Sequence, residues 1–92
     1  MTTEVPCSSA WCVYMLQCAD GSLYTGITTD VARRVAEHND DSGLGARYTR
    51  SRRPVAVVYV EFANDRAQAS RREAAIKQLD RMRKLALCAS TP

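Results

Sequence analysis

Residues 11–18 form an almost continuous apolar run that is too short for a typical helix. Such a run is typical of a strand that is buried on both faces and lies in the centre of its sheet. The following Asp20-Gly21 pair has the residue types of a tight hairpin turn. Residues 23–27 then alternate, which places Tyr24 and Gly26 on one face of a second strand. The sequence therefore predicts a β-hairpin over residues 11–27.

The remaining chain predicts a third strand and two or three helices. Thr28, Thr29 and Asp30 are candidate caps of a first helix. Further along, the pattern predicts a loop over residues 43–53, a strand over residues 55–62, a helix from residue 64 or 65 to about 79, and a short helix over residues 81–87. The third strand is expected to pair with residues 11–18. We predict one α+β domain of order β-β-α-β-α-α over residues 11–88, after a disordered lead-in (residues 1–10) and before a tail (residues 89–92).

Composition and charge narrow the possible partners. No apolar run approaches the roughly 20 residues that a membrane helix needs, so no membrane partner is expected. The N-terminus lacks the basic and apolar regions of a signal peptide, and a cytoplasmic location is expected. All 13 Lys and Arg residues lie between Arg33 and Lys84, and the net charge is +3. This asymmetry suits a polyanion such as nucleic acid, although a solvated basic surface explains the charge equally well.

Two tyrosines stand on neighbouring strands of the predicted hairpin. A single strand tyrosine is usually a core or edge residue with a tethered hydroxyl group. Tyr14 and Tyr24 together can bring two hydroxyl groups to one face of the sheet. A strand glycine such as Gly26 often marks the close approach of a ligand or another backbone. We therefore expect an open strand surface beside the two phenols that could hold a phosphate.

Three charged or titratable helical residues have both a structural and a functional interpretation. Arg34 and His38 share one face of the first helix; Arg34 could pair with Asp30, and His38 could be a helix-end histidine favoured by the dipole. Glu73 borders the apolar face of the second helix, where a carboxylate is either tethered to an arginine or placed to bind something. One carboxylate, several waters and a substrate phosphate form the usual Mg²⁺ arrangement.

A basic loop adds a candidate nucleic-acid surface. Four arginines surround one tyrosine without a nearby carboxylate in the sequence, and this mixture suits a surface that follows the phosphate backbone and stacks on bases. The alternative is a solvated loop. The candidate nucleic-acid-binding residues are Arg33, which is also spaced to pair with Glu37, and Arg47, Tyr48, Arg50, Arg52 and Arg53.

In this order and spacing, several short motifs resemble those of one family. They are Cys12-Val13-Tyr14, Tyr24-Thr25-Gly26, Arg33-Arg34 with His38-Asn39, Gly45-Ala46-Arg47-Tyr48-Thr49, Arg53-Pro54, and Arg72-Glu73 with Ile76-Lys77. The chain resembles the GIY-YIG nuclease superfamily, in particular its short stand-alone bacterial members, over about residues 11–87. Cys12 and Val13 replace the Gly and Ile of the first motif, and Thr25 replaces the Ile of the second, while both tyrosines and Gly26 remain.

The resemblance implies a three-stranded antiparallel sheet flanked by helices, and hydrolysis of DNA phosphodiester bonds with one divalent metal ion, Mg²⁺ or Mn²⁺. It implies that Glu73 holds the metal and that Arg34 stabilises charge on the phosphoryl group. Tyr24 would position or deprotonate the attacking water, Tyr14 would assist at the phosphate, and His38 would orient groups or relay a proton. Gly26 would be a structural residue of the site.

Two functional classes follow from these residues. The first is a metal-dependent endonuclease on structured or single-stranded DNA, as in DNA repair. Because larger members carry a separate binding domain, a partner protein or a homodimer would supply target selection. The second class is a nucleic-acid-binding module without catalysis, or an adaptor to a repair enzyme. Metal-dependent cleavage separates the first class from the second.

Overall fold

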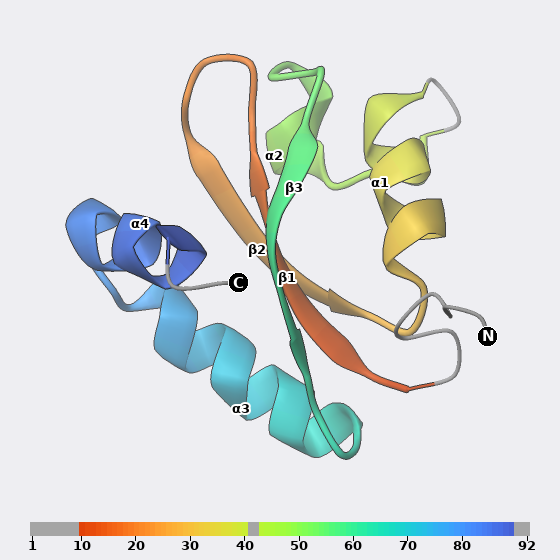
Figure 1. Cartoon of the computed structure of the whole chain (residues 1–92). Helices are drawn as coiled ribbons and strands as arrows, with labels where there is room; N and C mark the ends of the chain where they lie inside the picture. Colours follow the sequence, from red (N-terminus) through yellow and green to blue (C-terminus); the bar gives the residue numbers. More distant parts are fainter. Residues whose placement is uncertain (1–9, 41–42, 90–92) are drawn as a thin grey trace, which may run out of the picture.

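The computed structural model describes residues 10–40 and 43–89 (Figure 1). Its elements are β1 (Cys12–Gln17), β2 (Leu23–Thr28), α1 (Val31–Asn39), α2 (Arg47–Arg50), β3 (Ala56–Phe62), α3 (Arg66–Lys77) and α4 (Arg81–Ala89). The α+β class is confirmed. Nearly all of the predicted lead-in and tail, residues 1–9 and 90–92, lies outside the described residues.

The three strands form one antiparallel sheet in the order β2-β1-β3. The central place of β1 and its pairing with β3 are both confirmed. In the β1–β2 register, Tyr14 lies directly opposite Gly26, and Leu16 lies opposite Tyr24. Because paired residues project to the same face, this register brings the two tyrosines together.

Each face of β1 is buried against a different helix. Val13 and Met15 pack with Ala69 and Ile76 of α3, whereas Tyr14 and Leu16 face the side that carries α1. Figure 1 shows the sheet between α1 and α2 on one side and α3 and α4 on the other. Each fully buried aliphatic side chain of this kind stabilises the fold by roughly 1.5–3 kcal/mol. The unbroken apolar run of β1 follows from this arrangement in three layers.

Aspartates begin three of the helices, as their sequence positions predict. The side chain of Asp30 accepts a hydrogen bond from the Arg33 backbone N–H at 3.0 Å, and Asp65 and Asp80 cap α3 and α4 in the same way. At the other end of α1, the Asn39 side chain bonds both the N–H and the carbonyl of Val55, at 2.7 and 3.0 Å. These two hydrogen bonds fix the end of α1 to the start of β3.

The loop predicted over residues 43–53 contains the one-turn helix α2, so that part of the prediction is wrong. Four residues cannot hold a helix by their own propensity, so tertiary contacts must stabilise it. Thr49 is fully buried and its hydroxyl group donates to the Ala46 carbonyl at 3.0 Å. Arg52 bonds Asp20 in the hairpin turn at 3.1 Å. One of the loop arginines is therefore balanced by a carboxylate that is distant in the sequence.

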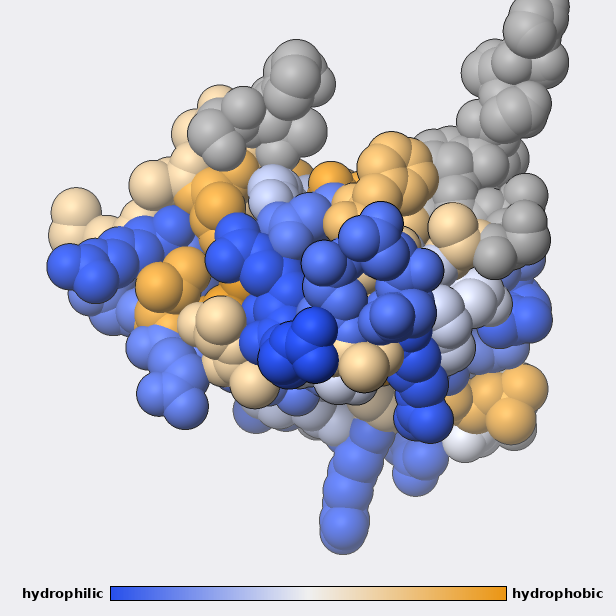
Figure 2. All heavy atoms as spheres, turned by 90° about the horizontal axis from the view of Figure 1, so that it is seen from below, coloured by the Kyte–Doolittle hydropathy of each residue, from blue (hydrophilic) through white to orange (hydrophobic). Residues whose placement is uncertain are grey.

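The surface is largely polar on the underside of the molecule. α3 lies at the bottom of Figure 1, and the same face in Figure 2 is mostly hydrophilic, with hydrophobic side chains in separate small patches. None of the helices in the described residues has the length and hydropathy required to cross a membrane.

Candidate active site

The Tyr14 hydroxyl group lies at the centre of the candidate site. Tyr14 is 1% exposed, and its ring passes over Gly26 on the neighbouring strand. A Cβ atom added at Gly26 would lie 2.6 Å from Tyr14 Oη and 2.8 Å from Tyr14 Cζ. The open strand surface that was expected at Gly26 is thus filled by the Tyr14 side chain. Gly26 is needed for the close approach of a residue from the chain itself.

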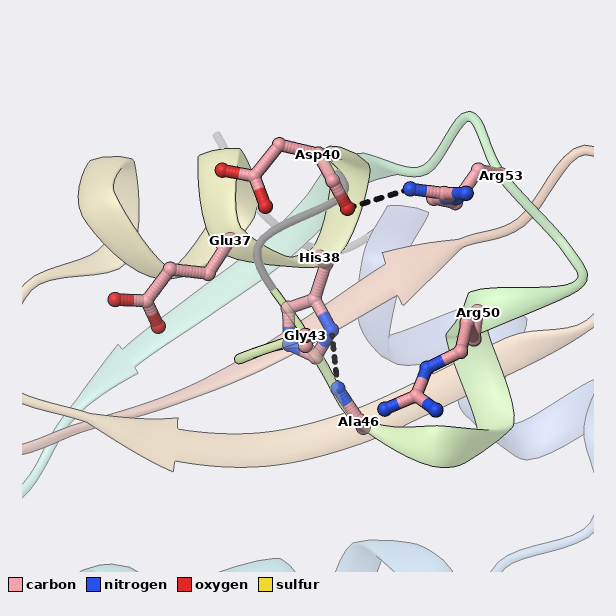
Figure 3. A pocket seen from close by; sticks show the side chains of 8 residues that line it. Glu37, His38, Asp40, Gly43, Ala46, Arg50 and Arg53 are labelled. Atoms are coloured by element: carbon pink, nitrogen blue, oxygen red, sulfur yellow. Dashed lines mark hydrogen bonds between the residues drawn. The ribbon is translucent and has the colours of Figure 1, made fainter.

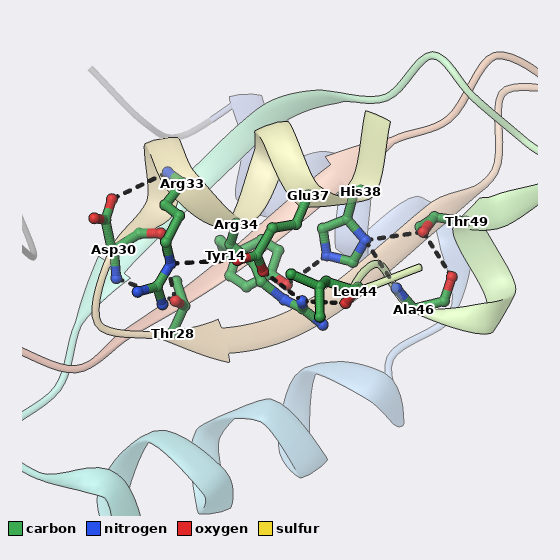
Figure 4. A network of polar contacts seen from close by, with 10 residues as sticks. All are labelled: Tyr14, Thr28, Asp30, Arg33, Arg34, Glu37, His38, Leu44, Ala46 and Thr49. Carbon is green, nitrogen blue, oxygen red and sulfur yellow. Dashed lines mark hydrogen bonds and ion pairs between the residues drawn. The ribbon is translucent and has the colours of Figure 1, made fainter. Parts of the chain in front are cut away.

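His38 connects this hydroxyl group to the α2 turn (Figure 4). Its Nε2 lies 2.9 Å from Tyr14 Oη, and its Nδ1 lies 2.8 Å from Thr49 Oγ1 and 3.3 Å from the Ala46 N–H nitrogen. His38 lies in the last turn of α1, as the helix-end interpretation expects, but it is 1% exposed and its partners come from β1 and the α2 turn. Thr49 was not predicted as a site residue. The only signal for it was its place in the segment of residues 45–49 that resembles the family.

The protonation states of this pair follow from its environment. Burial, reinforced by the neighbouring Tyr24, raises the pKa of Tyr14 to about 12, although Arg34 acts in the opposite direction. Desolvation, and then the positive charge of Arg34, lower the pKa of His38 below its usual 6.5. At neutral pH the phenol is therefore protonated and the imidazole is neutral. A neutral imidazole has one donor and one acceptor nitrogen, which allows it to bridge Tyr14 and the α2 turn.

The lowered pKa of His38 predicts a pH-dependent stability. Between its folded and unfolded pKa values the unfolded chain binds more protons, so the free energy of unfolding rises with pH. The full stability is present above the unfolded pKa of 6.5 and is lost as the pH falls toward the folded value. We expect this loss in urea unfolding as the pH falls below about 7.5, with a slope of at most about 1.4 kcal/mol per pH unit.

His38→Gln is the control for this prediction, because His38 is the only histidine in the chain. The variant is expected to be less stable at every pH and to lack the loss of stability below the unfolded pKa. An equally steep dependence in His38→Gln would show that another group is responsible.

Arg34 reaches the same hydroxyl group from α1. Its Nη1 donates to the Glu37 carboxylate at 2.8 Å and to the Leu44 carbonyl at 2.6 Å. The predicted ion pair with Asp30 is wrong, because Asp30 caps the helix. The guanidinium group also lowers the pKa of Tyr14, through a hydrogen bond and through its charge, against the larger effect of burial. Arg34 is 26% exposed, so it can contact a ligand as well as the phenol.

Tyr24 forms part of a cluster of rings that extends from Tyr48 on α2 to His38 and Tyr14. Its ring centroid lies 6.5 Å from that of Tyr14 and 5.3 Å from that of His38. Tyr48 stacks on Tyr24 with a centroid distance of 5.8 Å and an interplanar angle of 22°. The Arg52 guanidinium carbon lies 4.0 Å from the Tyr48 centroid. Tyr24 is only half-buried, and these ring contacts keep it beside Tyr14 and His38, which are fully buried.

Glu73 approaches from α3, which packs against β2 and β1. Its side chain is 23% exposed, and its carboxylate pairs with Lys77 at 3.1 Å rather than with an arginine. The charge of Glu73 contributes to the raised pKa of Tyr14, after the larger effects of burial and Tyr24, which places the carboxylate within electrostatic reach of the hydroxyl group.

The donor set around Glu73 fits a magnesium ion that binds with its substrate. Within residues 10–40 and 43–89 no cluster of three or more His, Cys, Asp or Glu side chains could form a complete protein cage. Mg²⁺ is commonly held by one or two carboxylates, several waters and substrate phosphates. A single accessible carboxylate, which acts on the same hydroxyl group as the Arg34 guanidinium, is compatible with that arrangement.

The structure thus brings the predicted catalytic and metal-binding side chains to one place. His38 bonds the Tyr14 hydroxyl group, and three other side chains act on the same hydroxyl group electrostatically: Tyr24, Arg34 and Glu73. The site lies at the β2 side of the sheet, where α1 and α3 approach from different layers.

The predicted nucleic-acid-binding residues are more widely spread. Arg52 and Arg53 make intramolecular bonds, to Asp20 and to the backbone at the end of α1. Arg33 pairs with Glu37 at 3.5 Å, and Arg47 is exposed on α2. Arg50 lines a cavity of about 220 Å³ beside His38, between α1 and the α2 turn (Figure 3). Only some of these arginines therefore keep their guanidinium groups available for a partner.

Solved structures of similar sequence have the same fold. The solution NMR structure of a UPF0213 protein from Bacillus halodurans is 44% identical, with 86% of this chain and 82% of that chain covered and a TM-score of 0.54. The NMR structure of a protein from E. faecalis is 40% identical, with 91% and 83% covered and a TM-score of 0.55.

Sequence relatives agree with the structural comparison. A UPF0213 protein of Desulfotalea psychrophila is 65% identical over 78 residues, which are 85% of this chain and 70% of the relative. A UPF0213 protein of Halobacterium salinarum is 55% identical over 75 residues, which are 82% and 95% of the two chains. The family described as the GIY-YIG catalytic domain matches residues 10–86. This chain is therefore a member of the GIY-YIG catalytic-domain family and of its small stand-alone UPF0213 group.

Proposed function

We propose that this protein is a metal-dependent endonuclease that hydrolyses DNA phosphodiester bonds. The observation that carries the proposal is the convergence of His38, Arg34 and Glu73 on the Tyr14 hydroxyl group. A neutral imidazole, a guanidinium group and an accessible carboxylate at one place supply proton transfer, charge stabilisation and cation binding. Membership of a nuclease-like catalytic family supports the same conclusion.

Each side chain has a role that matches its environment. Arg34, with its planar fork of donors, binds the phosphoryl oxygens and stabilises their developing charge. Tyr24 is the more accessible phenol and positions the attacking water. Tyr14, protonated and buried, donates a hydrogen bond and fixes the geometry. His38 holds and orients the Tyr14 hydroxyl group through this hydrogen bond.

Glu73 would hold the divalent cation, Mg²⁺ or Mn²⁺, together with the substrate phosphate. The cation would supply Lewis-acid stabilisation of the phosphoryl group. Lys77 now pairs with this carboxylate at 3.1 Å, and its exposed side chain can turn away toward solvent or a phosphate.

The substrate proposed here is structured or single-stranded DNA, as in DNA repair, in the cytoplasm. Arg33, Arg47 and Arg50 supply exposed positive charge near the site. A partner protein or a second copy of the chain would select the target. Of the two classes considered above, binding without catalysis remains the alternative outcome of the test.

The test is a cleavage assay with the purified chain on branched and single-stranded DNA. We expect cleavage with Mg²⁺ or Mn²⁺ and none with EDTA, because the Glu73 carboxylate is itself negative and only a cation held there could offset the charge of the phosphoryl transition state. Salt-sensitive binding without cleavage under all these conditions would refute the nuclease and support the binding module.

Arg34→Lys tests the assignment of the phosphate ligand. It keeps the charge and removes the two-pronged geometry, so the cleavage rate should fall by about tenfold or more. Arg71→Lys is the matched control, because Arg71 is exposed on α3 and has no role in the proposed site, and it should cleave like the wild type. Equal rates for the two variants would remove Arg34 from the site.

A further inference from the structure

A groove of about 260 Å³ adjoins the candidate site at the edge strand β2. Residues from four elements line it: Leu23, Tyr24, Thr25, Tyr48, Lys77 and Lys84. Tyr24 belongs both to this groove and to the cluster of rings that includes His38. Whatever occupies the groove therefore lies next to the reacting groups.

The groove carries two ammonium groups. Lys77 is paired with Glu73 at 3.1 Å, which places it at the boundary between the groove and the candidate site. Lys84 on α4 is half-buried, and in the described part of the chain no carboxylate pairs with it. A lysine that packs its stem along a surface keeps its charge in water, where it is available to an anion. The groove is thus suited to a negatively charged group.

Its aromatic rings are already engaged by other side chains. Tyr48 is stacked on Tyr24 and lies under the Arg52 guanidinium group. The Lys77 ammonium nitrogen lies 5.9 Å from the centroid of the Tyr24 ring. Base stacking requires a free ring face. Recognition here consequently depends on charge and on contacts with ring edges and Leu23, rather than on a base.

We propose that this groove binds the phosphate and deoxyribose of the nucleotide next to the cleaved bond, with Lys84 contacting the phosphate. The proposal rests on the function proposed above and adds a path for the DNA strand, from the Tyr14 hydroxyl group across β2 to α4. At about 260 Å³ the groove has room for the sugar and phosphate of one nucleotide, and the base lies outside it. Binding in the groove is independent of base identity.

The test measures the salt dependence of DNA binding without metal. Fluorescence anisotropy of a labelled single-stranded oligodeoxythymidylate is recorded at a series of NaCl concentrations in EDTA. Losing one phosphate contact reduces the slope of log K against log salt by about 0.7 for single strands. Lys84→Ala should show this reduction and weaker binding. Arg83→Ala removes the same charge from the exposed neighbouring position of α4 and should keep the wild-type slope.

Two further measurements make the outcome decisive. Lys84→Arg should restore the slope, and oligodeoxyadenylate should bind like oligodeoxythymidylate. Equal slopes for Lys84→Ala and Arg83→Ala at unchanged thermal stability would overturn the subsite, as would a strong preference for one base. The binding assay contains no metal and no cleavage step. If the wild-type chain binds DNA here but never cleaves it in the cleavage assay, the proposed nuclease activity is refuted and the result of the binding test still stands. A wild-type chain that binds no DNA overturns both proposals.

Discussion

Glu73→Gln is expected to reduce DNA cleavage by about 10²–10³-fold while leaving the fold intact. The amide keeps the size of the side chain but removes the negative charge that would hold a cation. Because the side chain is partly exposed and its partner Lys77 is a surface residue, little stability depends on this ion pair. The cleavage rate at saturating Mg²⁺ measures the effect, and urea unfolding confirms the fold.

Glu61→Gln is the matched control for this change. Glu61 is similarly exposed (27%) and also pairs with a basic residue of α3, Arg72 at 2.7 Å, but it does not act on Tyr14. It should cleave at the wild-type rate. A second measurement uses the phenol itself: since the charge of Glu73 contributes to the raised pKa of Tyr14, Glu73→Gln should lower that pKa in a tyrosinate titration. Equal cleavage by both variants would contradict the assignment.

Gly26→Ala is expected to destabilise the fold by about 1–3 kcal/mol and to abolish cleavage. The new methyl group would lie 2.6 Å from Tyr14 Oη and 2.8 Å from Tyr14 Cζ, closer than side chains pack. Tyr14 cannot move aside easily, because it is buried and its hydroxyl group is bonded to His38. Either the phenol leaves its position or the two strands separate.

A double-mutant cycle isolates this clash from other effects on β2. Tyr14→Ala alone leaves a cavity and should cost about 3–5 kcal/mol, as large aromatic truncations do. In the double variant the methyl group at position 26 occupies space that the ring has vacated. The two costs should therefore sum to more than the cost of the double variant, as measured by urea unfolding. Additive costs would show that the two residues do not share this space.

The strands and helix starts were predictable because their causes are local. The apolar run of residues 11–18 indicates burial on both faces, and the structure places β1 between two helical layers. Asp30, Asp65 and Asp80 cap helices through backbone bonds to residues three positions further along. A pattern of this kind needs no knowledge of the rest of the fold.

The candidate site was predictable only as a set of residues. The order of Tyr14, Tyr24, Arg34, His38 and Glu73 indicated a family, and the family match is confirmed. From the residues themselves, a helix-end role for His38 and an ion pair with Asp30 for Arg34 were the simpler interpretations; His38 is at the helix end but buried, and Arg34 pairs with Glu37 instead. Thr49 had no local signal, because its importance comes from a bond to His38, 11 residues earlier in the chain.

The sequence by itself determined the central strand, the hairpin, the helix caps and the membership of the family. Tertiary structure decided that α2 forms, that the Tyr14 hydroxyl group fills the space above Gly26, and that Glu73 of α3 contributes to the raised pKa of that hydroxyl group. The physical reason is separation along the chain. Tyr14 and His38 are 24 residues apart, and Arg52 and Asp20 are 32 apart. Such contacts arise from packing, whereas propensity and periodicity report only on near neighbours.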